Sequence, residues 1–433
     1  MPFRIALSGL DAASTDLQVT GHNIANAATN GFKESRAEFA DIYANSVSDV
    51  STTSAGRGVR VTRVAQQFSQ GNIDFTANNL DLAINGEGFF VLEDTSGNVT
   101  YTRAGAYSAD REGYVVDHAD NRLQVFSPDG TGGFNTGSTT DLELPLLSGS
   151  PSATTTVTTS INLDPTSTAI PAGTAFDPTQ PTTYDNATST TVYDSLGVAH
   201  TMTMYYREHP TTANSWLVFS TVLDTDGTTV LPLDPTTGAT VAVPASAGYP
   251  AAEATFDTSG ALVPSVGSVD ANGDIAYNAE AITGAAAMSL TFDYSNTTQY
   301  GSAFAVNDLT QDGFAPGRLS GVDIDNSGVV FARFTNGQSD PLGMVALAKF
   351  NNQQGLRQVG DTSWAETFDS GDVQMGQPGT SSLGLIQSGG LENSNVDIAE
   401  QLVNLITAQR NFQANAQVIT TADTITQTII NIR

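Results

Sequence analysis

The chain has 433 residues, enough for roughly two to four domains, and it has no cysteine, which excludes disulfides, thiolate metal sites and cysteine nucleophiles. Its formal net charge of −29 argues against nucleic acid or an anionic membrane as the main partner. With 39% hydrophobic residues, only 14% charged residues and 40 glycines, the composition indicates a mainly β, turn-rich protein.

The acidic charge is concentrated in the middle of the chain. Residues 1–70 hold six acidic and six basic side chains, whereas residues 151–304 hold fourteen acidic side chains and one base, Arg207. Neutral ends suit packing among copies of the chain, and an acidic middle suits exposure to solvent. Neither membrane insertion nor a cleaved signal peptide is expected, because no stretch has the required apolar length.

The first thirty residues show the alternating 4-3 spacing of a coiled-coil seam. The positions in this register are Phe3, Leu7, Leu10, Ser14, Leu17, Gly21, Ile24 and Ala28. Glycines, threonines and asparagines weaken this helix, so we expect it to be frayed in a free monomer and to order against neighbouring copies.

The end of the chain supplies a partner helix with a similar but interrupted register. Asn395 is the expected N-cap, and Asp397 and Glu400 place negative charge near the positive end of the helix dipole. Two ordinary amphipathic helices on a globular core are the alternative. The residues predicted to form the self-assembly seam are Phe3, Leu7, Leu10, Leu17, Ile24, Ile398, Leu402, Leu405, Phe412, Ile419, Ile425 and Ile429.

Between the two helices the pattern is that of short strands separated by turns. The expected strands cover 59–64, 72–75, 82–84, 89–92, 99–103, 113–116, 122–126, 189–193, 200–207, 216–223, 322–324, 329–334 and 344–350. Residues 131–185 are rich in Thr, Ser, Gly and Pro, which predicts long loops.

The predicted fold is mainly β with terminal α-helices that form a coiled-coil-like pair, and its domains are nested and discontinuous. Residues 1–30 and 395–433 form the helical domain, and 31–75 with 383–394 form an extended connection. Residues 76–150 with 300–382 form a β-rich domain, and 151–299 form an inserted, acidic, β-rich outer domain.

No catalytic or metal-binding pattern stands out. Asp323 opens a stretch like a calcium loop, but the twelfth position is Phe334 where a bidentate Glu is needed, so a β-turn is expected instead. The four histidines show no metal-ligand spacing, and His200 is expected at the surface or a strand edge. We expect no cofactor, no metal and no enzymatic activity.

Three stretches resemble signatures of the bacterial flagellar rod and hook protein family. They are 23–33, then 82–91 followed by 101–105, and finally 390–397 with 408–415. Residues 193–200, 309–317, 334–337 and 344–350 are similar to the hook members. The signature positions at the two ends are Asn23, Ile24, Asn26, Thr29, Gly31, Phe32, Lys33, Ser394, Asn395 and Val396.

The resemblance implies a helical tube of identical subunits, with terminal helices lining the channel and β-domains outside. Such a tube is a universal joint that passes torque from rod to filament in swimming motility. The implied partners are other copies of the chain, the distal rod protein, the hook cap protein, the hook–filament junction protein and the flagellar type III export apparatus.

The implied location is the flagellum outside the cell, reached without a cleaved signal peptide. Some relatives crosslink their subunits through a cysteine, and this chain lacks one. Within the family, the alternative is a distal rod-type axial protein. The acidic middle domain of about 150 residues argues against this alternative. A secreted β-rich enzyme or adhesin is the alternative from another class.

Overall fold

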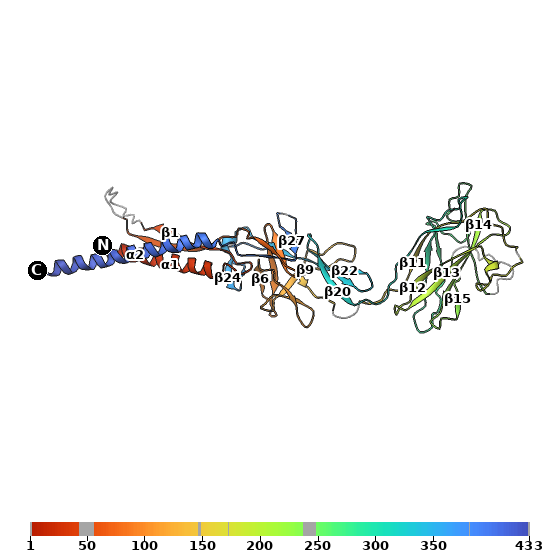
Figure 1. Cartoon of the computed structure of the whole chain (residues 1–433), viewed down its shortest axis with the longest axis horizontal. Helices are drawn as coiled ribbons and strands as arrows, with labels where there is room; N and C mark the ends of the chain where they lie inside the picture. The colour runs from red at the N-terminus through yellow and green to blue at the C-terminus, as the bar shows by residue number, and fades with distance from the viewer. Residues whose placement is uncertain are drawn as a thin grey trace. The chain divides into compact units, whose positions relative to one another are not determined.

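The computed structural model describes residues 2–42, 56–145, 149–171, 173–236, 248–380 and 382–431 (Figure 1). The chain forms two compact units. The first combines Met1–Leu146, Leu319–Arg333 and Ser339–Arg433, and the second combines Leu147–Arg318 with Phe334–Gln338. The predicted mainly β fold with terminal helices is confirmed, whereas the four-part domain division remains a prediction.

The first unit begins and ends in a helix. Helix α1 covers Pro2–Ala25 and helix α2 covers Ile398–Asn431. They pack against each other in antiparallel orientation, because Asn23 meets Gln401 at one end and Gly9 meets Asn415 further along (Figure 1).

Helix α2 is capped by a different residue from the one predicted. Asp397 Oδ1 accepts hydrogen bonds from the N–H groups of Ala399, at 2.8 Å, and Glu400, at 3.3 Å. Asp397 is therefore the N-cap, and its negative charge lies at the positive end of the helix. The prediction that Asn395 caps this helix is wrong, because its side chain is engaged elsewhere.

A two-stranded ribbon packs against α1. Its strands β1, Ser35–Asp41, and β2, Val59–Gln66, are antiparallel. The sequence predicts β2 but not β1, whose alternation of charged and apolar residues has no firm period. Exposed side chains on this ribbon include Phe39 and Val64.

The other strands of the first unit build a large antiparallel sheet and two small strand pairs. The path of the large sheet is β20-β21-β22-β9-β5-β6-β25-β24. Its bounds are β20 Leu319–Ile324, β21 Val329–Phe334, β22 Ser339–Val345, β9 Arg122–Phe126, β5 Phe89–Glu93, β6 Val99–Thr102, β25 Ser363–Ala365 and β24 Arg357–Gly360. Shorter strands attached to it are β7 Ser108–Ala109, β8 Val115–Val116, β10 Thr140–Asp141, β23 Leu347–Lys349 and β26 Gln374–Gly376.

The two small pairs join early and late parts of the chain. Strand β4, Leu82–Asn85, pairs with β27, Leu385–Ser388, and strand β3, Ile73–Phe75, pairs with β28, Gly390–Glu392. The core of this unit likewise takes side chains from both parts, such as Phe90 and Leu347 on neighbouring strands. The strand pairs and the core of this unit are therefore completed by residues from both early and late parts of the chain.

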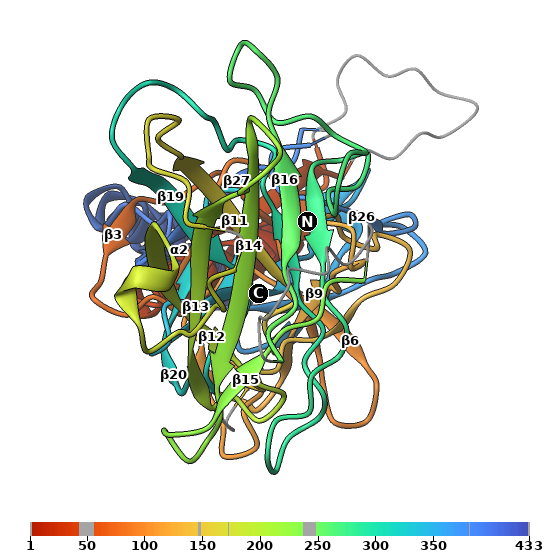
Figure 2. The same cartoon turned by 90° about the vertical axis from the view of Figure 1, so that its right-hand side faces the viewer.

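The second unit is a sandwich of two sheets. One has the order β12-β13-β14-β15 with β16 beside β14, and the other has the order β17-β18-β11-β19 (Figure 2). Side chains from both sheets, including Trp216 and Phe292, fill the core between them. The bounds are β11 Thr156–Asn162, β12 Asn186–Tyr193, β13 Ala199–Glu208, β14 Ser215–Leu223, β15 Val230–Pro232, β16 Ala252–Thr255, β17 Asp274–Ala276, β18 Thr291–Asp293 and β19 Ala305–Gln311.

The second unit departs from two sequence-based expectations. Strand β11 lies within the stretch predicted as long loops, because its Thr and Ser residues mask a strand pattern whose Val157 and Ile161 are buried. His200 is buried, not at the surface: its Nδ1 lies 2.9 Å from Leu223 O and its Nε2 lies 3.3 Å from Asp194 Oδ2. Two short 3-10 helices, Pro181–Thr183 and Gln353–Gly355, complete the described elements.

Candidate assembly site at the terminal helices

The contact between the two helices within one chain is made largely by small and polar side chains. Ala6, Ala13 and Thr20 are buried on α1, and Gln401 and Ala408 are buried on α2. The backbones approach closely at Gly9, where an added Cβ atom would lie 2.5 Å from the Asn415 side chain. The small residues thus let the helices approach closely, and many of their large apolar side chains stay exposed.

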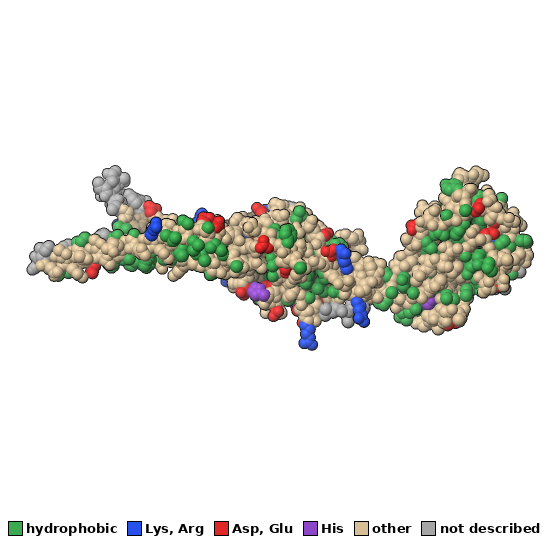
Figure 3. All heavy atoms as spheres, in the orientation of Figure 1, with side chains coloured by type: hydrophobic (Ala, Val, Ile, Leu, Met, Phe, Trp, Pro, Cys, Tyr) green, Lys and Arg blue, Asp and Glu red, His purple; other side chains and the backbone are tan. Residues whose placement is uncertain are grey.

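Many of the large apolar side chains of both helices remain exposed in the single chain. Figure 3 shows hydrophobic side chains along the surface of the helical part. At least 40% of the surface of each is accessible: Phe3, Ile5, Leu7, Ile398, Leu402, Val403, Ile406, Val418, Ile425 and Ile430. So many exposed large apolar side chains on two helices indicate an interaction site.

Helix α2 also extends beyond its intrachain partner. The pairing of Asn23 with Gln401 and of Gly9 with Asn415 places the start of α1 opposite the part of α2 near residue 422. Phe3 lines a groove of about 850 Å³ together with Val418, Ala422 and Ile425 of α2. The last turns of α2 therefore lack a cover from α1.

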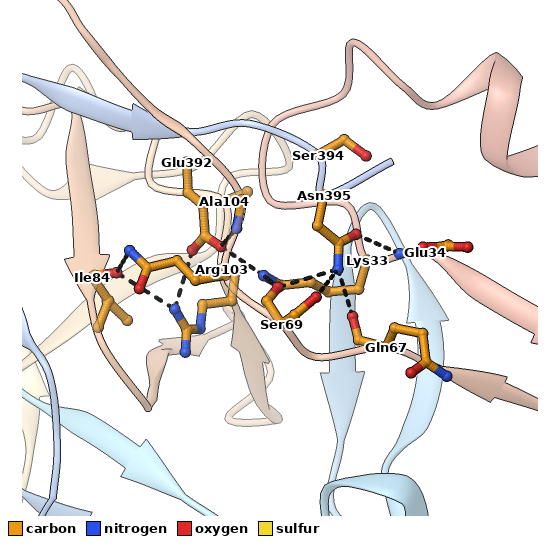
Figure 4. A network of polar contacts seen from close by, with 12 residues as sticks. Lys33, Glu34, Gln67, Ser69, Ile84, Arg103, Ala104, Glu392, Ser394 and Asn395 are labelled. Carbon is orange, nitrogen blue, oxygen red and sulfur yellow. Dashed lines mark hydrogen bonds and ion pairs between the residues drawn. The ribbon is translucent and has the colours of Figure 1, made fainter. Parts of the chain in front are cut away.

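A buried network of charges joins the segment that follows α1, the segment that precedes α2 and the loop after β6 (Figure 4). The Glu392 carboxylate accepts hydrogen bonds from Lys33 Nζ at 2.6 Å, from Arg103 Nη1 at 3.1 Å and from the Gly71 N–H at 2.9 Å. Lys33 Nζ also donates to Ser69 O at 2.8 Å. Glu392 lies just before α2 and thus connects three stretches of the chain that are distant from it in the sequence.

Burial determines the electrostatics of this network. Desolvation lowers the pKa of Lys33, and the neighbouring Glu392 carboxylate works in the opposite direction. Desolvation likewise lowers the pKa of Arg103, again opposed by Glu392. Arg103 also donates to Gly86 O at 2.8 Å and lies over the Phe89 ring, which provides further stabilisation of its charge.

Two asparagines connect the helices to the ribbon. The Asn23 amide donates to Ser35 O at 2.7 Å and to Gln401 Oε1 at 3.1 Å, while its oxygen accepts the Ser35 N–H at 2.9 Å. Asn395 Oδ1 accepts the Glu34 N–H at 2.8 Å, and its Nδ2 donates to Gln67 O and Ser69 O (Figure 4). These bonds fix the direction in which each helix leaves the β-structure.

Family models of flagellar axial proteins match most of the chain. The flagella basal body rod protein model matches residues 3–33, and the flagellar hook protein FlgE/F/G D1 domain model matches 83–172. The flagellar basal body protein FlaE D2 domain model matches 161–314, and the flagellar basal body rod FlgEFG protein C-terminal model matches 387–432.

Relatives align over the full length. The chain is 35% identical over 439 residues to flagellar hook protein FlgE of Salmonella typhimurium, covering 100% of both chains. It is 35% identical over 441 residues to that of Escherichia coli, again covering 100% of both, and 32% identical over 452 residues to that of Borreliella burgdorferi, covering 99% of this chain and 98% of the relative. The chain belongs to the flagellar hook protein FlgE family.

A solved structure has the same kind of fold. The crystal structure of the Helicobacter pylori flagellar hook protein FlgE2 matches with a TM-score of 0.50 and 15% identity, covering 74% of this chain and 99% of that one. At this identity the similarity concerns the fold alone.

In this FlgE-family chain the predicted seam residues divide into two groups. Leu10, Leu17, Ile24, Leu405, Phe412 and Ile419 are half-buried between or beside the helices. Phe3, Leu7, Ile398, Leu402 and Ile425 are exposed, and the side chain of Ile429 lies outside the described residues. Their role in self-assembly remains a prediction.

The signature residues gather around the polar network. Asn23, Gly31, Phe32 and Lys33 are buried, and the Gly31 N–H donates to Glu392 O at 2.7 Å. Thr29 bonds Asn26, and Ser394 accepts the Val396 N–H. Ile24, Asn26, Thr29, Ser394, Asn395 and Val396 are half-buried.

Sequence reasoning missed three residues of this network as site residues: Arg103, Glu392 and Gln401. Arg103 and Glu392 stand inside stretches that resemble the family. Each is a single charged residue among small and polar residues, which was the one signal that could have drawn attention to it. The sequence could not show which residues they pair with, because the partners are hundreds of residues away. Gln401 falls on the expected helix and carried no signal.

The other candidate sites named from the sequence show no catalytic or metal-binding arrangement among the described residues. The loop that begins like a calcium site is the turn between β20 and β21, where Asp325 Oδ1 accepts the Val329 N–H at 2.9 Å. In the part of the chain that the structure describes, no group of three His, Cys, Asp or Glu residues could hold a metal ion. None of the described helices is long and apolar enough to cross a membrane.

Proposed function

We propose that this chain is the structural subunit of the flagellar hook and polymerises through the exposed apolar faces of α1 and α2. The observation that carries the proposal is that intrachain packing uses small side chains and leaves large ones such as Phe3, Leu402 and Ile425 accessible. Covering them in a tube removes apolar surface from water, which favours assembly.

The polar network supplies what a torque-bearing subunit needs, a fixed connection between helices and β-structure. Lys33, Glu392 and Arg103 are buried and joined by short charge-assisted hydrogen bonds. A force applied to the helices is transmitted to the β-structure of the first unit through these bonds and those of Asn23 and Asn395.

The same proposal includes the family's implied partners. We propose contacts with the distal rod protein at one end of the tube and with the hook–filament junction protein at the other, growth beneath the hook cap protein, and export through the flagellar type III apparatus without a cleaved signal peptide. The subunit has a structural and not an enzymatic role. The full-length FlgE-family match favours the hook over a distal rod protein, a secreted enzyme or an adhesin.

Replacing Leu402 by Asp tests the assembly surface. In the tube, a buried carboxylate without a partner costs several kcal/mol, so we expect polymerisation to be lost. Leu402 is 46% exposed in the single chain, so the melting temperature of the monomer should change little. Sedimentation and electron microscopy measure tubes, and calorimetry measures the monomer.

Asn214→Asp is the matched control. Asn214 is exposed between β13 and β14 of the second unit, which contains neither helix. It adds the same charge outside the proposed contact and should still form tubes. Normal tubes from Leu402→Asp would contradict the proposed surface, and a comparable loss of monomer stability would show that Leu402 already packs within one chain.

A further inference from the structure

The chain contains four Asn-Gly pairs, at 30–31, 85–86, 272–273 and 336–337. Asparagine is a chemically labile residue, and it is most reactive before glycine, whose flexible backbone and missing side chain let its nitrogen approach the asparagine side chain. The residue order is the same in all four pairs. Any difference in their reactivity therefore depends on how the fold restrains each pair.

Two of the pairs are restrained by contacts with distant segments. The Gly31 N–H is buried and donates to Glu392 O at 2.7 Å. Asn85 belongs to strand β4, and the Gly86 N–H donates to Gln70 Oε1 at 3.1 Å. The attack requires the glycine nitrogen to turn toward the asparagine side chain, so these bonds must break first.

The pair at 336–337 is restrained at both residues. Asn336 Nδ2 donates to Ala315 O at 2.8 Å, and its Oδ1 accepts the Gln338 N–H at 3.1 Å. The Gly337 N–H donates to Phe334 O at 3.0 Å. The side-chain amide of Asn336 therefore cannot rotate toward the glycine nitrogen without losing two hydrogen bonds.

The pair at 272–273 is held least. The Asn272 side chain is exposed, and among the described residues its amide interacts with the Asp270 carboxylate of the same turn and with no distant segment. The Gly273 N–H donates to Asp270 O at 3.3 Å, which is the longest of the four glycine N–H bonds. Only contacts within one exposed turn oppose the reaction here.

We propose that Asn272 is the deamidation site of the folded chain. The Gly273 nitrogen forms a bond with Asn272 Cγ, the Cγ–Nδ2 bond breaks, and ammonia leaves with the proton of the Gly273 N–H, so that a cyclic succinimide remains. Water then opens the ring. Cleavage of the bond from the nitrogen to Cγ gives aspartate, and cleavage of the bond from the nitrogen to the main-chain carbonyl carbon gives isoaspartate. The reaction needs only water and does not depend on the proposed assembly.

Isoaspartate disturbs the turn in which it forms. Asp270 Oδ1 accepts the N–H groups of Asn272 at 2.7 Å and Asp274 at 2.9 Å. In isoaspartate the side-chain methylene becomes part of the main chain, so the Asp274 N–H lies one atom farther along the chain from Asp270. Asp274 begins β17, which pairs with β18 and places Ile275 in the core of the second unit. Deamidation therefore weakens the edge of one sheet of this unit.

Incubation of the full-length protein at mildly alkaline pH, followed by peptide mapping, tests the site. Mass spectrometry detects each conversion as an increase of about 1 Da. We expect 272–273 to react at least about fivefold faster than each of the other pairs, the factor by which one ordinary hydrogen bond lowers the population of an opened conformation. Equal rates, or a faster reaction at another pair, would overturn the proposal.

The same measurement in urea is the control for the role of the fold. In the unfolded chain the four pairs should react at similar rates, because the bonds that protect three of them are lost. If 272–273 were faster by the same factor in urea, local sequence and not the fold would set the order, and the structural argument would be wrong. Asn272→Gln, whose attack would require a larger ring, should remove the conversion from this peptide.

A comparison of melting temperatures tests the effect on the turn. The isoaspartate form, separated from aged protein by chromatography, should melt lower than Asn272→Asp, which adds the same negative charge without the extra main-chain atom. Equal melting temperatures of the two forms would overturn the inferred weakening of the sheet edge.

Discussion

Glu392 is the residue on which the junction between helices and β-structure depends most. Its side chain is fully buried and faces two cations, Lys33 at 2.6 Å and Arg103 at 3.1 Å. Taking three charges out of water is costly, so such a cluster is weak evidence for net stability. We expect its consequence to be specificity, because moving any of the three segments would leave a buried charge without its partner.

Glu392→Gln tests this role at the residue scale. Without the carboxylate, two cations remain buried with no anion, and the loss of one partner from a buried pair typically costs about 3–5 kcal/mol. We expect a clearly lower melting temperature and a less cooperative unfolding of the first unit by calorimetry. Glu112→Gln, which changes an exposed carboxylate, is the control and should melt like the unaltered chain.

At the scale of elements, one turn type recurs throughout both units. An Asp carboxylate accepts backbone N–H groups two and four residues ahead, and a Gly follows at the third position. In the turn at Asp257, Oδ1 accepts the N–H groups of Ser259 at 2.8 Å and Ala261 at 3.0 Å, and Gly260 has φ of 83°. Turns that begin at Asp94, Asp194 and Asp270 share this pattern. At Asp325 the Ser327 hydroxyl is the donor two residues ahead, and the Val329 N–H is the donor four residues ahead. Much of the acidic charge therefore stabilises turns.

This turn chemistry predicts how stability changes with pH. Hydrogen bonds, first from the Ser259 side chain and then from the Ala261 N–H, lower the pKa of Asp257 in the folded chain. A lowered folded-state pKa gives stability that is present above the unfolded value of about 3.9 and is lost as pH falls through the folded value. In Asp257→Asn, which keeps an acceptor oxygen but cannot be protonated in this range, the melting temperature should fall less between pH 5 and pH 2.

Asp308→Asn, at an exposed position on β19 of the same unit, is the control for the loss of one negative charge. If both variants flatten the pH dependence equally, the effect comes from net charge and not from the turn.

At the scale of the whole molecule, the second unit is an insertion whose two ends meet. The Gly149 N–H donates to Gly317 O at 2.7 Å. Strand β19 pairs with β11, so the second unit reaches past residue 299, where the sequence-based boundary of the outer domain was placed. The unit has its own core, so its removal need not disturb the first unit.

Deleting residues 150–316 and joining the ends through Gly-Ser tests this modular organisation. We expect a folded protein that still forms tubes, because the helices, the ribbon and the polar network all belong to the first unit. Circular dichroism checks folding and electron microscopy checks assembly. A folded deletion variant that forms no tubes would show that the second unit makes obligatory contacts between copies.

The sequence by itself determined the elements whose signals are local. A 4-3 apolar spacing over many turns specifies a helix, so α1 and α2 were predicted close to their observed limits. Asp-x-x-Gly turns at 194–197 and 224–227 mark the start of β13 and the end of β14, so both strands were predicted close to their observed limits. The family resemblance, carried by short runs at both ends, was likewise readable without a structure.

The tertiary structure decided everything that depends on distant partners. Whether Asn395 caps its own helix or holds Glu34 and Gln67, and whether His200 lies at the surface or is buried, depends on segments far away in the sequence. The partners of Glu392 are 359 and 289 residues away, so no local pattern could identify them. The tertiary structure also decided which face of each helix is covered within the chain. The sequence left this open, because either the small or the large residues of α1 and α2 could form the contact between the helices.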